Sequence, residues 1–365
     1  KNRLEHSRSF GHHRRHHMSP PNERIICWGN LCLDHVFDLE FYPTEDTGER
    51  ALSSRKSLGG NGANSTRVLA QLRGPRSRVS WIGPVPAKDE PDSAFALAAL
   101  QAGGVDTSLL EEVDGEGLPT AAIFFSRRTG SRTIVSTRKG VRELGLPHFT
   151  EAVKGAFTVE AVQKHGQPRW CHFECRQSPQ IVLQLAEAWR EVGGLVPLSL
   201  EVEKTSIKPD ALAPLLRLCD PVFFSQVFME AHFESLLGKV SDGVATKRRK
   251  LSEQGWQDHM ALQGMRALKE LVHPIQGRWI CTWGKLGAFA LDTASGQSYF
   301  EPAQVQQKVV DSVGAGDTFI AASIHALLQG ADMQQTLHCA CAVAGHKVGQ
   351  LGFDSLSVAL PKGME

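Results

Sequence analysis

The segment Ile-Ile-Cys-Trp at residues 25–28 opens a regular alternation of short apolar runs and longer amphipathic stretches. The short runs are rich in β-branched and aromatic residues, which are typical of buried strands. The stretches between them run to about a dozen residues and carry apolar residues at helical spacing. This alternation predicts one doubly wound α/β domain, in which helices cover a mostly parallel sheet.

The expected strands lie at residues 25–28, 79–82, 121–125, 170–173, 196–201, 221–224 and 279–282. The expected helices include residues 63–72, 93–102, 181–192, 260–272, 317–329 and 333–348. Two pieces fall outside the alternation, one polar and broken at 38–58, the other with two short strands around a turn at 127–130. We expect a domain over residues 24–359, from which segments at about 35–58 and 118–137 project as a small β-sheet lid.

The composition excludes several classes of protein. Of the 365 residues, 41% are hydrophobic and 22% are charged, and the net charge is only +1, so nothing drives general binding to nucleic acid or to an anionic membrane surface. The longest apolar stretches, such as residues 94–100, are too short to cross a bilayer. The eight cysteines form no Cys-x-x-Cys pair, which favours buried, reduced thiols in a cytoplasmic protein over a zinc site.

Two polar segments do not contribute to this domain. Residues 1–23 are rich in His and Arg without apolar periodicity, which predicts a disordered basic tail, although a processed transit segment and a start at Met18 stay open. The segment 238–259 carries Lys-Arg-Arg-Lys at 247–250. Because this run is short and isolated, we interpret it as a solvated surface insertion rather than a nucleic-acid patch.

The strongest chemical motif is Val-Val-Asp-Ser-Val-Gly-Ala-Gly-Asp-Thr-Phe at residues 309–319, which opens a helix. Free amides of Gly314, Ala315 and Gly316 at a helix start predict an anion hole. Asp317 beside it is a poor phosphate ligand, since like charges repel, and a suitable base for an attacking hydroxyl. The alternative is that Asp317 merely caps the helix.

A second motif, Gly-Gly-Asn-Gly-Ala-Asn at residues 59–64, also leads into a helix. The glycines, Gly60 among them, let a ligand lie against the backbone, and the carboxamides of Asn61 and Asn64 suit sugar hydroxyls, which both donate and accept hydrogen bonds. Helix capping by Asn61 is the alternative. Asp34, which follows the first strand, is expected in a loop at the carboxyl end of the sheet, where it can accept vicinal hydroxyls.

These motifs resemble the ribokinase-type carbohydrate kinases over residues 25–354. The phrases Glu-Val-Glu-Lys at 201–204 and Gly-Phe-Asp at 352–354 are similar to the branch of that family that phosphorylates ketohexoses. The resemblance implies a ribokinase-like three-layer fold with a β-sheet lid, through which the chain forms a homodimer. It also implies ATP and Mg²⁺ as cofactors and makes K⁺ near the anion hole a candidate.

The resemblance assigns roles residue by residue. It makes Asp317 the catalytic base, residues Gly314 to Gly316 the anion hole, and Asp34, Gly60, Asn61 and Asn64 the sugar ligands. It places Arg132 at the transferring phosphate. The residues that it places around ATP are Gly284, Lys285, Leu286, Gly287 and Cys341.

The expected function is ATP-dependent phosphorylation of a ketohexose, fructose to fructose 1-phosphate. One alternative keeps the chemistry and changes the acceptor to another sugar or a nucleoside. The other is a catalytically silent regulator that binds sugar or nucleotide. Because Asp34 is accompanied by no obvious paired cations in the sequence motifs, a phosphorylated sugar is expected to be a poor acceptor.

Overall fold

The computed structural model describes residues 22–129, 131–176, 178–240 and 259–364. Most of the expected tail, and most of the expected insertion with its basic run at 247–250, lie outside the described residues. The first strand, β1 (Glu23–Trp28), begins one residue before the expected start of the domain.

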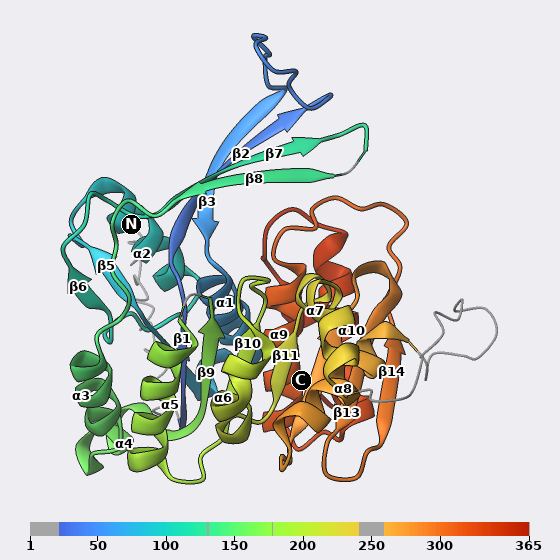
Figure 1. Cartoon of the computed structure of the whole chain (residues 1–365). Helices are drawn as coiled ribbons and strands as arrows, with labels where there is room; N and C mark the ends of the chain where they lie inside the picture. Colours follow the sequence, from blue (N-terminus) through green and yellow to red (C-terminus); the bar gives the residue numbers. More distant parts are fainter. Residues whose placement is uncertain (1–21, 130, 177, 241–258, 365) are drawn as a thin grey trace, which may run out of the picture.

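An eight-stranded sheet forms the middle layer of the molecule, in the order β14-β13-β12-β11-β10-β9-β1-β4 (Figure 1). Its strands from β12 to β4 are parallel, as expected, whereas β13 and β14 run antiparallel at one edge. The sequence analysis missed this edge hairpin, because its two strands follow β12 without an intervening helix. The remaining bounds are β4 (Ser77–Ile82), β9 (Gln167–Cys175), β10 (Leu198–Val202), β11 (Val222–Phe224), β12 (Arg278–Thr282), β13 (Gly287–Asp292) and β14 (Ser298–Pro302).

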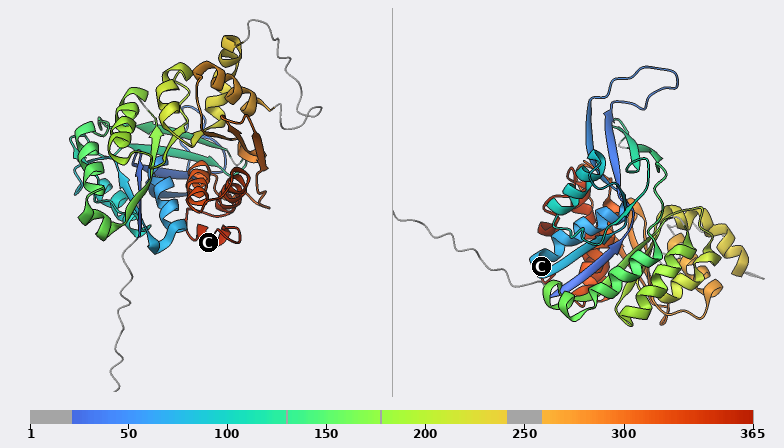
Figure 2. Two further views of the ribbon diagram at one scale, coloured as in Figure 1. Left: turned by 90° about the horizontal axis from the view of Figure 1, so that it is seen from below. Right: turned by 90° about the vertical axis from the view of Figure 1, so that its left-hand side faces the viewer.

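Helices cover both faces of this sheet and give the three expected layers (Figure 2). One face packs on α3 (Leu146–Ala156), α5 (Pro179–Gly193), α6 (Ala213–Leu218), α7 (Gln226–Val240) and α8 (Met260–Val272). The other face packs on α1 (Asn61–Arg73), α2 (Pro91–Ala102), α9 (Ala315–Leu328) and α10 (Met333–Val348). A short helix, α4 (Val159–His165), follows α3. The structure adds α3, α4, α6 and α7 to the helices expected from sequence.

A four-stranded sheet in the order β3-β2-β7-β8 stands above the body (Figure 1). It consists of β2 (Cys32–Leu39), β3 (Ser53–Gly59), β7 (Thr120–Ser126) and β8 (Arg132–Thr137). This sheet, called the lid below, confirms that the two segments outside the alternation pair with each other. The expected position of Asp34 in a loop is wrong: the chain passes from β1 directly into the lid, so Asp34 lies inside β2, opposite Ser57 and Ala121.

Smaller features complete the fold. Strands β5 (Pro84–Pro86) and β6 (Glu111–Val113) form a two-stranded sheet. All eight cysteines are free and seven are buried, as expected for reduced thiols. Among the described residues, no helix combines the length and the apolar character that a membrane crossing requires.

Candidate functional site

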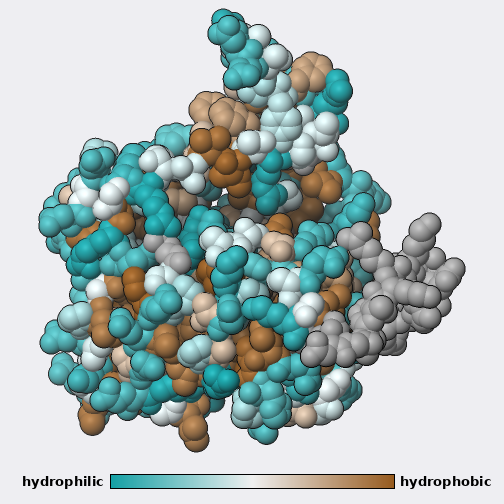
Figure 3. Space-filling view, in the orientation of Figure 1, coloured by the Kyte–Doolittle hydropathy of each residue, from teal (hydrophilic) through white to brown (hydrophobic). Residues whose placement is uncertain are grey.

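A cavity of about 360 Å³ lies between the lid and the body. Figure 3 shows the lid sheet standing over this face of the molecule. The cavity is lined by the loop after β1, the first turns of α1 and α9, and residues of β2, β7 and β8. Parallel strands and helix N-termini therefore meet the lid at one place, which is where an α/β fold ordinarily binds its ligand.

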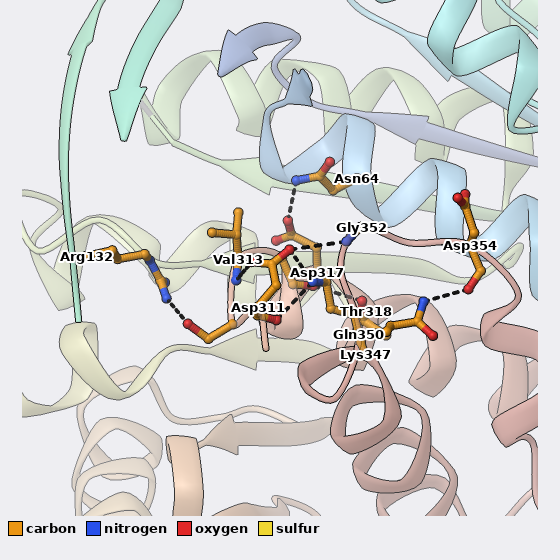
Figure 4. Close-up of polar contacts among 12 residues, drawn as sticks. Asn64, Arg132, Asp311, Val313, Asp317, Thr318, Lys347, Gln350, Gly352 and Asp354 are labelled. Carbon is orange, nitrogen blue, oxygen red and sulfur yellow. Dashed lines mark hydrogen bonds and ion pairs between the residues drawn. The ribbon is translucent and has the colours of Figure 1, made fainter. Parts of the chain in front are cut away.

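Asp317 lies in the first turn of α9, buried at the floor of this cavity. The amide nitrogen Nδ2 of Asn64, in the first turn of α1, donates a 2.8 Å hydrogen bond to Asp317 Oδ2 (Figure 4). The helix-capping interpretations are wrong for both motifs. Gly314 and Gly60 occupy the N-cap positions of α9 and α1, so neither Asp317 nor Asn61 is the capping residue of its helix.

The expected anion hole begins at Gly314, whose backbone is left-handed, with φ 74°. A Cβ atom on this residue would lie 2.2 Å from Cζ of Phe353, so only glycine fits against that ring. Phe353 belongs to the Gly-Phe-Asp phrase, which thus shapes the loop before α9. The first amides of α9 have no partner within the helix and carry the positive end of its dipole, an arrangement that suits an anion.

Asp311 ties this loop to the C-terminal part of the chain. Its Oδ1 accepts a hydrogen bond from the backbone nitrogen of Val313 at 3.0 Å, and its Oδ2 accepts one from Gly352 at 3.3 Å. The ammonium of Lys347 in α10 donates to the same Oδ2 at 2.9 Å (Figure 4). The sequence analysis missed this ion pair. A signal was present: Lys347 continues the buried face of α10 four residues after Val343.

Carboxylates form one wall of the cavity. Asn61 Nδ2 donates to Glu201 Oε1 at 3.2 Å and to Glu203 Oε2 at 3.0 Å. Glu201, in β10, and Glu203, just after β10, therefore face the start of α1. Behind them, Glu174 Oε1 accepts a hydrogen bond from Arg176 at 3.3 Å. Sequence analysis missed Glu174 and Arg176, because nothing in their local sequence marks them.

Glu174 also holds the backbone of the site. Its Oε2 accepts hydrogen bonds from the backbone nitrogens of Asn30 at 2.9 Å and Gly62 at 3.1 Å. Gly60, between these two segments, has φ 102°, and a Cβ atom there would lie 2.2 Å from the carbonyl oxygen of Asn30. The Gly-Gly turn therefore packs directly against the loop that follows β1.

Burial changes the acidity of the two carboxyl groups that sequence analysis selected. Burial raises the pKa of Asp317 to about 8, and the charges of Glu203 and Glu174 add to this effect, while the Asn64 hydrogen bond opposes it. Burial likewise raises the pKa of Asp34 to about 6. A carboxyl group that titrates near neutral pH and lies in a cavity is suited to proton transfer.

The structure brings most of the expected site residues together. Arg132 reaches from β8 to the loop before α9, where its Nη1 donates a 2.8 Å hydrogen bond to Ser312 Oγ (Figure 4). The expected residues that line the cavity are Asp34, Gly60, Asn61, Asn64, Arg132, Gly314, Ala315, Gly316 and Asp317.

The residues expected around ATP lie elsewhere. Gly284, Lys285 and Leu286 form a short 3₁₀ turn between β12 and β13, outside the described lining of the cavity. Gly287 and Cys341 meet at one carbonyl oxygen, that of Glu301. Cys341 Sγ lies 3.8 Å from this oxygen, and a Cβ atom on Gly287 would lie 2.1 Å from it. These residues form a group of their own between the edge hairpin and α10.

Solved structures show the same fold. The ribokinase of Cryptococcus neoformans var. grubii in complex with ADP is 17% identical, with a TM-score of 0.66, over 93% of this chain and 97% of that one. The ribokinase of Arabidopsis thaliana complexed with ribose and ATP is 18% identical, with a TM-score of 0.66, over 94% and 96%. The three-layer architecture with its lid is therefore a ribokinase-like fold.

Sequence comparison then defines the family. A sequence model of the pfkB family of carbohydrate kinases matches residues 22–358, and the chain belongs to this family of ATP-dependent sugar kinases. The chain is 29% identical to the ketohexokinase of Mus musculus over 92% of this chain and 99% of that protein. It is 27% identical to a nucleoside kinase of Methanocaldococcus jannaschii, over 36% of this chain and 42% of that protein.

Replacing Gly314 by Ala tests the fit of the loop against Phe353. We expect the free energy of unfolding to fall by about 1–3 kcal/mol, because the new methyl group meets the ring and the backbone is left-handed. Gly316→Ala is the matched control, since an added Cβ there has no atom within 4 Å. Denaturant unfolding measures both, and equal losses would show that Gly314 is not constrained by Phe353.

Replacing Asp317 by Asn tests its raised pKa. In the folded protein, the raised pKa favours the neutral carboxyl group of Asp317. The contribution of this group to the free energy of unfolding is therefore complete at a pH below the pKa of Asp317 in the unfolded chain, and it is lost as the pH rises toward about 8. The melting temperature of the variant, relative to wild type, should therefore increase between pH 5 and pH 8.5. The exposed Asp89→Asn serves as control, and a difference that is flat with pH would contradict the shift.

Proposed function

We propose that this kinase phosphorylates a ketohexose, fructose at its 1-hydroxyl group, with ATP as donor. The observation that carries the proposal is the buried pair of Asp317 and Asn64, beside Asp34, in a cavity under the lid. Asn64 Oδ1 is buried there without a hydrogen-bond partner among the described residues, so it is available to accept from a sugar hydroxyl. Similarity to the ketohexokinase of Mus musculus over nearly the whole chain supports the same acceptor.

In the proposed mechanism, Asp317 removes the proton from the acceptor hydroxyl as the oxygen attacks the terminal phosphate of ATP. The Asn64 amide holds the carboxylate in position. The amides of Gly314, Ala315 and Gly316 receive the negative charge of the transferring phosphoryl group, since they begin α9 and face the cavity. Arg132, which already reaches Ser312, adds a positive charge from the lid.

The residues present fit a nucleotide-bound Mg²⁺. In the described part of the chain, no three acidic, His or Cys side chains are grouped closely enough to hold a metal by themselves, and Mg²⁺ bound to ATP takes most of its ligands from phosphate and water. Glu201 Oε2 is buried, lines the cavity wall and lacks a described partner. It is the oxygen that would hold the cation or its water, and the cation would supply neutralisation of phosphate charge.

The acceptor is the finer part of the proposal. Sequence analysis expected no paired cations at the acceptor site, and three arginines, Arg138, Arg142 and Arg176, line the cavity as a whole. Arg142 donates to both oxygens of Glu111, at 2.8 and 3.2 Å, and Arg176 pairs with Glu174. Because the cavity contains arginines, a sugar phosphate belongs among the acceptors to be compared, and so does a nucleoside, given the partial match to a nucleoside kinase.

The experiment that tests the proposal is kcat/KM across fructose, ribose, adenosine and fructose 6-phosphate, with the position of the new phosphate read by NMR. We expect fructose to be preferred and its 1-hydroxyl to be the acceptor. A preference of more than about tenfold, or 1.4 kcal/mol in transition-state binding, for any other acceptor would overturn the ketohexose assignment.

Asp317→Asn separates catalysis from binding in the same assay. We expect kcat to fall by about 10²-fold or more with ATP affinity retained, because the amide keeps the shape but accepts no proton. In wild type, kcat/KM should fall on the acid side at a pH above the pKa of an ordinary carboxyl group, since burial raises the pKa of Asp317. Near-parental turnover of the variant would remove Asp317 as the base and revive the silent regulator.

A homodimer through the lid is also proposed. Strand β8 of the lid carries the exposed apolar side chains of Ile134 and Val135, the segment between β2 and β3 carries those of Phe41 and Leu52, and Figure 3 shows hydrophobic surface over the lid. Exposed apolar groups on and beside one sheet favour association.

A cytoplasmic location of the protein stays a prediction.

Val135→Asp tests the dimer. Val135 is 60% exposed on β8, and a charge there should convert a dimer to a monomer in analytical ultracentrifugation. Val159→Asp on α4, where the side chain is 75% exposed, is the control and should leave the assembly unchanged. An unchanged mass for both variants, or a monomeric wild type, would exclude a lid interface.

A further inference from the structure

Lys347 carries a charge that the proposed mechanism does not use. The side chain is fully buried at the end of α10, and its ammonium donates to both the carbonyl oxygen of Asp311, at 3.0 Å, and Asp311 Oδ2, at 2.9 Å (Figure 4). The ring of Phe353 lies 5.0 Å away, measured from Nζ to the ring centre, so that an aromatic face also meets the cation.

These contacts lead from Lys347 to the anion hole in two ways. Through Asp311, the ammonium is linked to the backbone nitrogen of Val313, the residue immediately before Gly314. Through Phe353, it adjoins the ring against which Gly314 packs. A buried ion pair of this kind fixes its neighbours, because removal of either partner leaves an uncompensated charge.

The contacts with Asp311 favour the charged form of Lys347. Burial lowers the pKa of the ammonium, and the Asp311 carboxylate opposes that decrease through its charge and its hydrogen bond. Both carboxylate oxygens of Asp311 accept hydrogen bonds. Oδ1 accepts from the backbone nitrogen of Val313, and Oδ2 accepts from Lys347 and from the backbone nitrogen of Gly352.

A monovalent cation does not fit at this place. An ion such as K⁺ would be held by carbonyl and carboxylate oxygens, and the carbonyl oxygen and Oδ2 of Asp311 beside the anion hole already accept from the ammonium of Lys347. A second positive ion at the same oxygens would be repelled by the first. The expectation of K⁺ near the anion hole therefore conflicts with the residues that this chain places there.

We propose that Lys347 is a built-in cation that positions the anion-hole loop through Asp311 and Phe353, so that phosphoryl transfer needs no added monovalent cation. The inference rests on the proposed role of Gly314, Ala315 and Gly316, but not on the identity of the acceptor. Lys347 touches neither substrate in this proposal and is a positioning residue.

The first test uses the wild-type enzyme with whichever acceptor it phosphorylates. Turnover is measured in a tetramethylammonium buffer while K⁺ or Na⁺ is added to 100 mM at constant ionic strength. We expect kcat to stay within twofold throughout. Activation by K⁺ of fivefold or more would overturn the proposal. If no acceptor is phosphorylated, the proposed function fails, and the same titration is read as the shift in melting temperature produced by ADP.

The second test is Lys347→Ala, which leaves room for a small cation. We expect kcat to fall at least tenfold with a smaller change in the KM for the acceptor, and K⁺, NH₄⁺ or methylammonium to restore a large part of it. Lys154→Met, an exposed lysine on α3, is the control and should respond to none of these ions. A folded Lys347→Ala enzyme with parental kcat, or with a loss that no cation rescues, would contradict the proposal. If the variant does not fold, the wild-type titration decides.

Discussion

The hydrogen bond between Asn64 and Asp317 is the interaction on which the site depends, because it joins the first turns of two helices that are 253 residues apart in sequence. Ser65 Oγ adds a second link by donating to the backbone carbonyl of Asp317 at 3.3 Å. Together these bonds aim the N-termini of α1 and α9 at one point beneath the lid. A shift of either helix would separate the carboxamide of Asn64 from the carboxylate of Asp317, so the geometry of the candidate site is set by helix packing rather than by a flexible loop.

The same packing concentrates negative charge. The charges of Glu174 and Glu203 raise the pKa values of both Asp317 and Glu201, and Arg176 is a cation that opposes the effect on Asp317. Such a cluster is unfavourable for the folded protein by itself, since buried carboxylates repel each other in a medium of low dielectric constant. It is stable enough because Asn61, Arg176 and backbone amides each satisfy particular oxygens. The burial and charge repulsion that raise the pKa of Asp317 also reduce the stability of the folded protein.

Sequence reasoning placed residues correctly where their position follows from a few adjacent residues. The Gly-Ala-Gly-Asp and Gly-Gly-Asn-Gly-Ala-Asn turns show helix starts, and helix starts converge in this fold, so Asp317 and Asn64 could be placed together. It failed where a role depends on partners far along the chain. Glu174 meets residues 112 and 144 positions away, and Lys347 meets Asp311 across 36 residues, so neither role appears in a local pattern. Asp34 was recognised by its chemistry but misplaced, because the pairing of β2 with β3 and β7 is a tertiary event.

The contact between Phe353 and Gly314 has a consequence for biosynthesis. A nascent chain that ends before residue 353 already contains all strands of both large sheets, the lid arginine and Asp317, yet it lacks the ring that sets the loop before α9. Because synthesis proceeds from the N-terminus, such a chain can bury most of its core while the loop before α9 still lacks its contact with Phe353. The loop before α9 therefore takes its final shape only after residue 353 has been added, later than the strands of both large sheets.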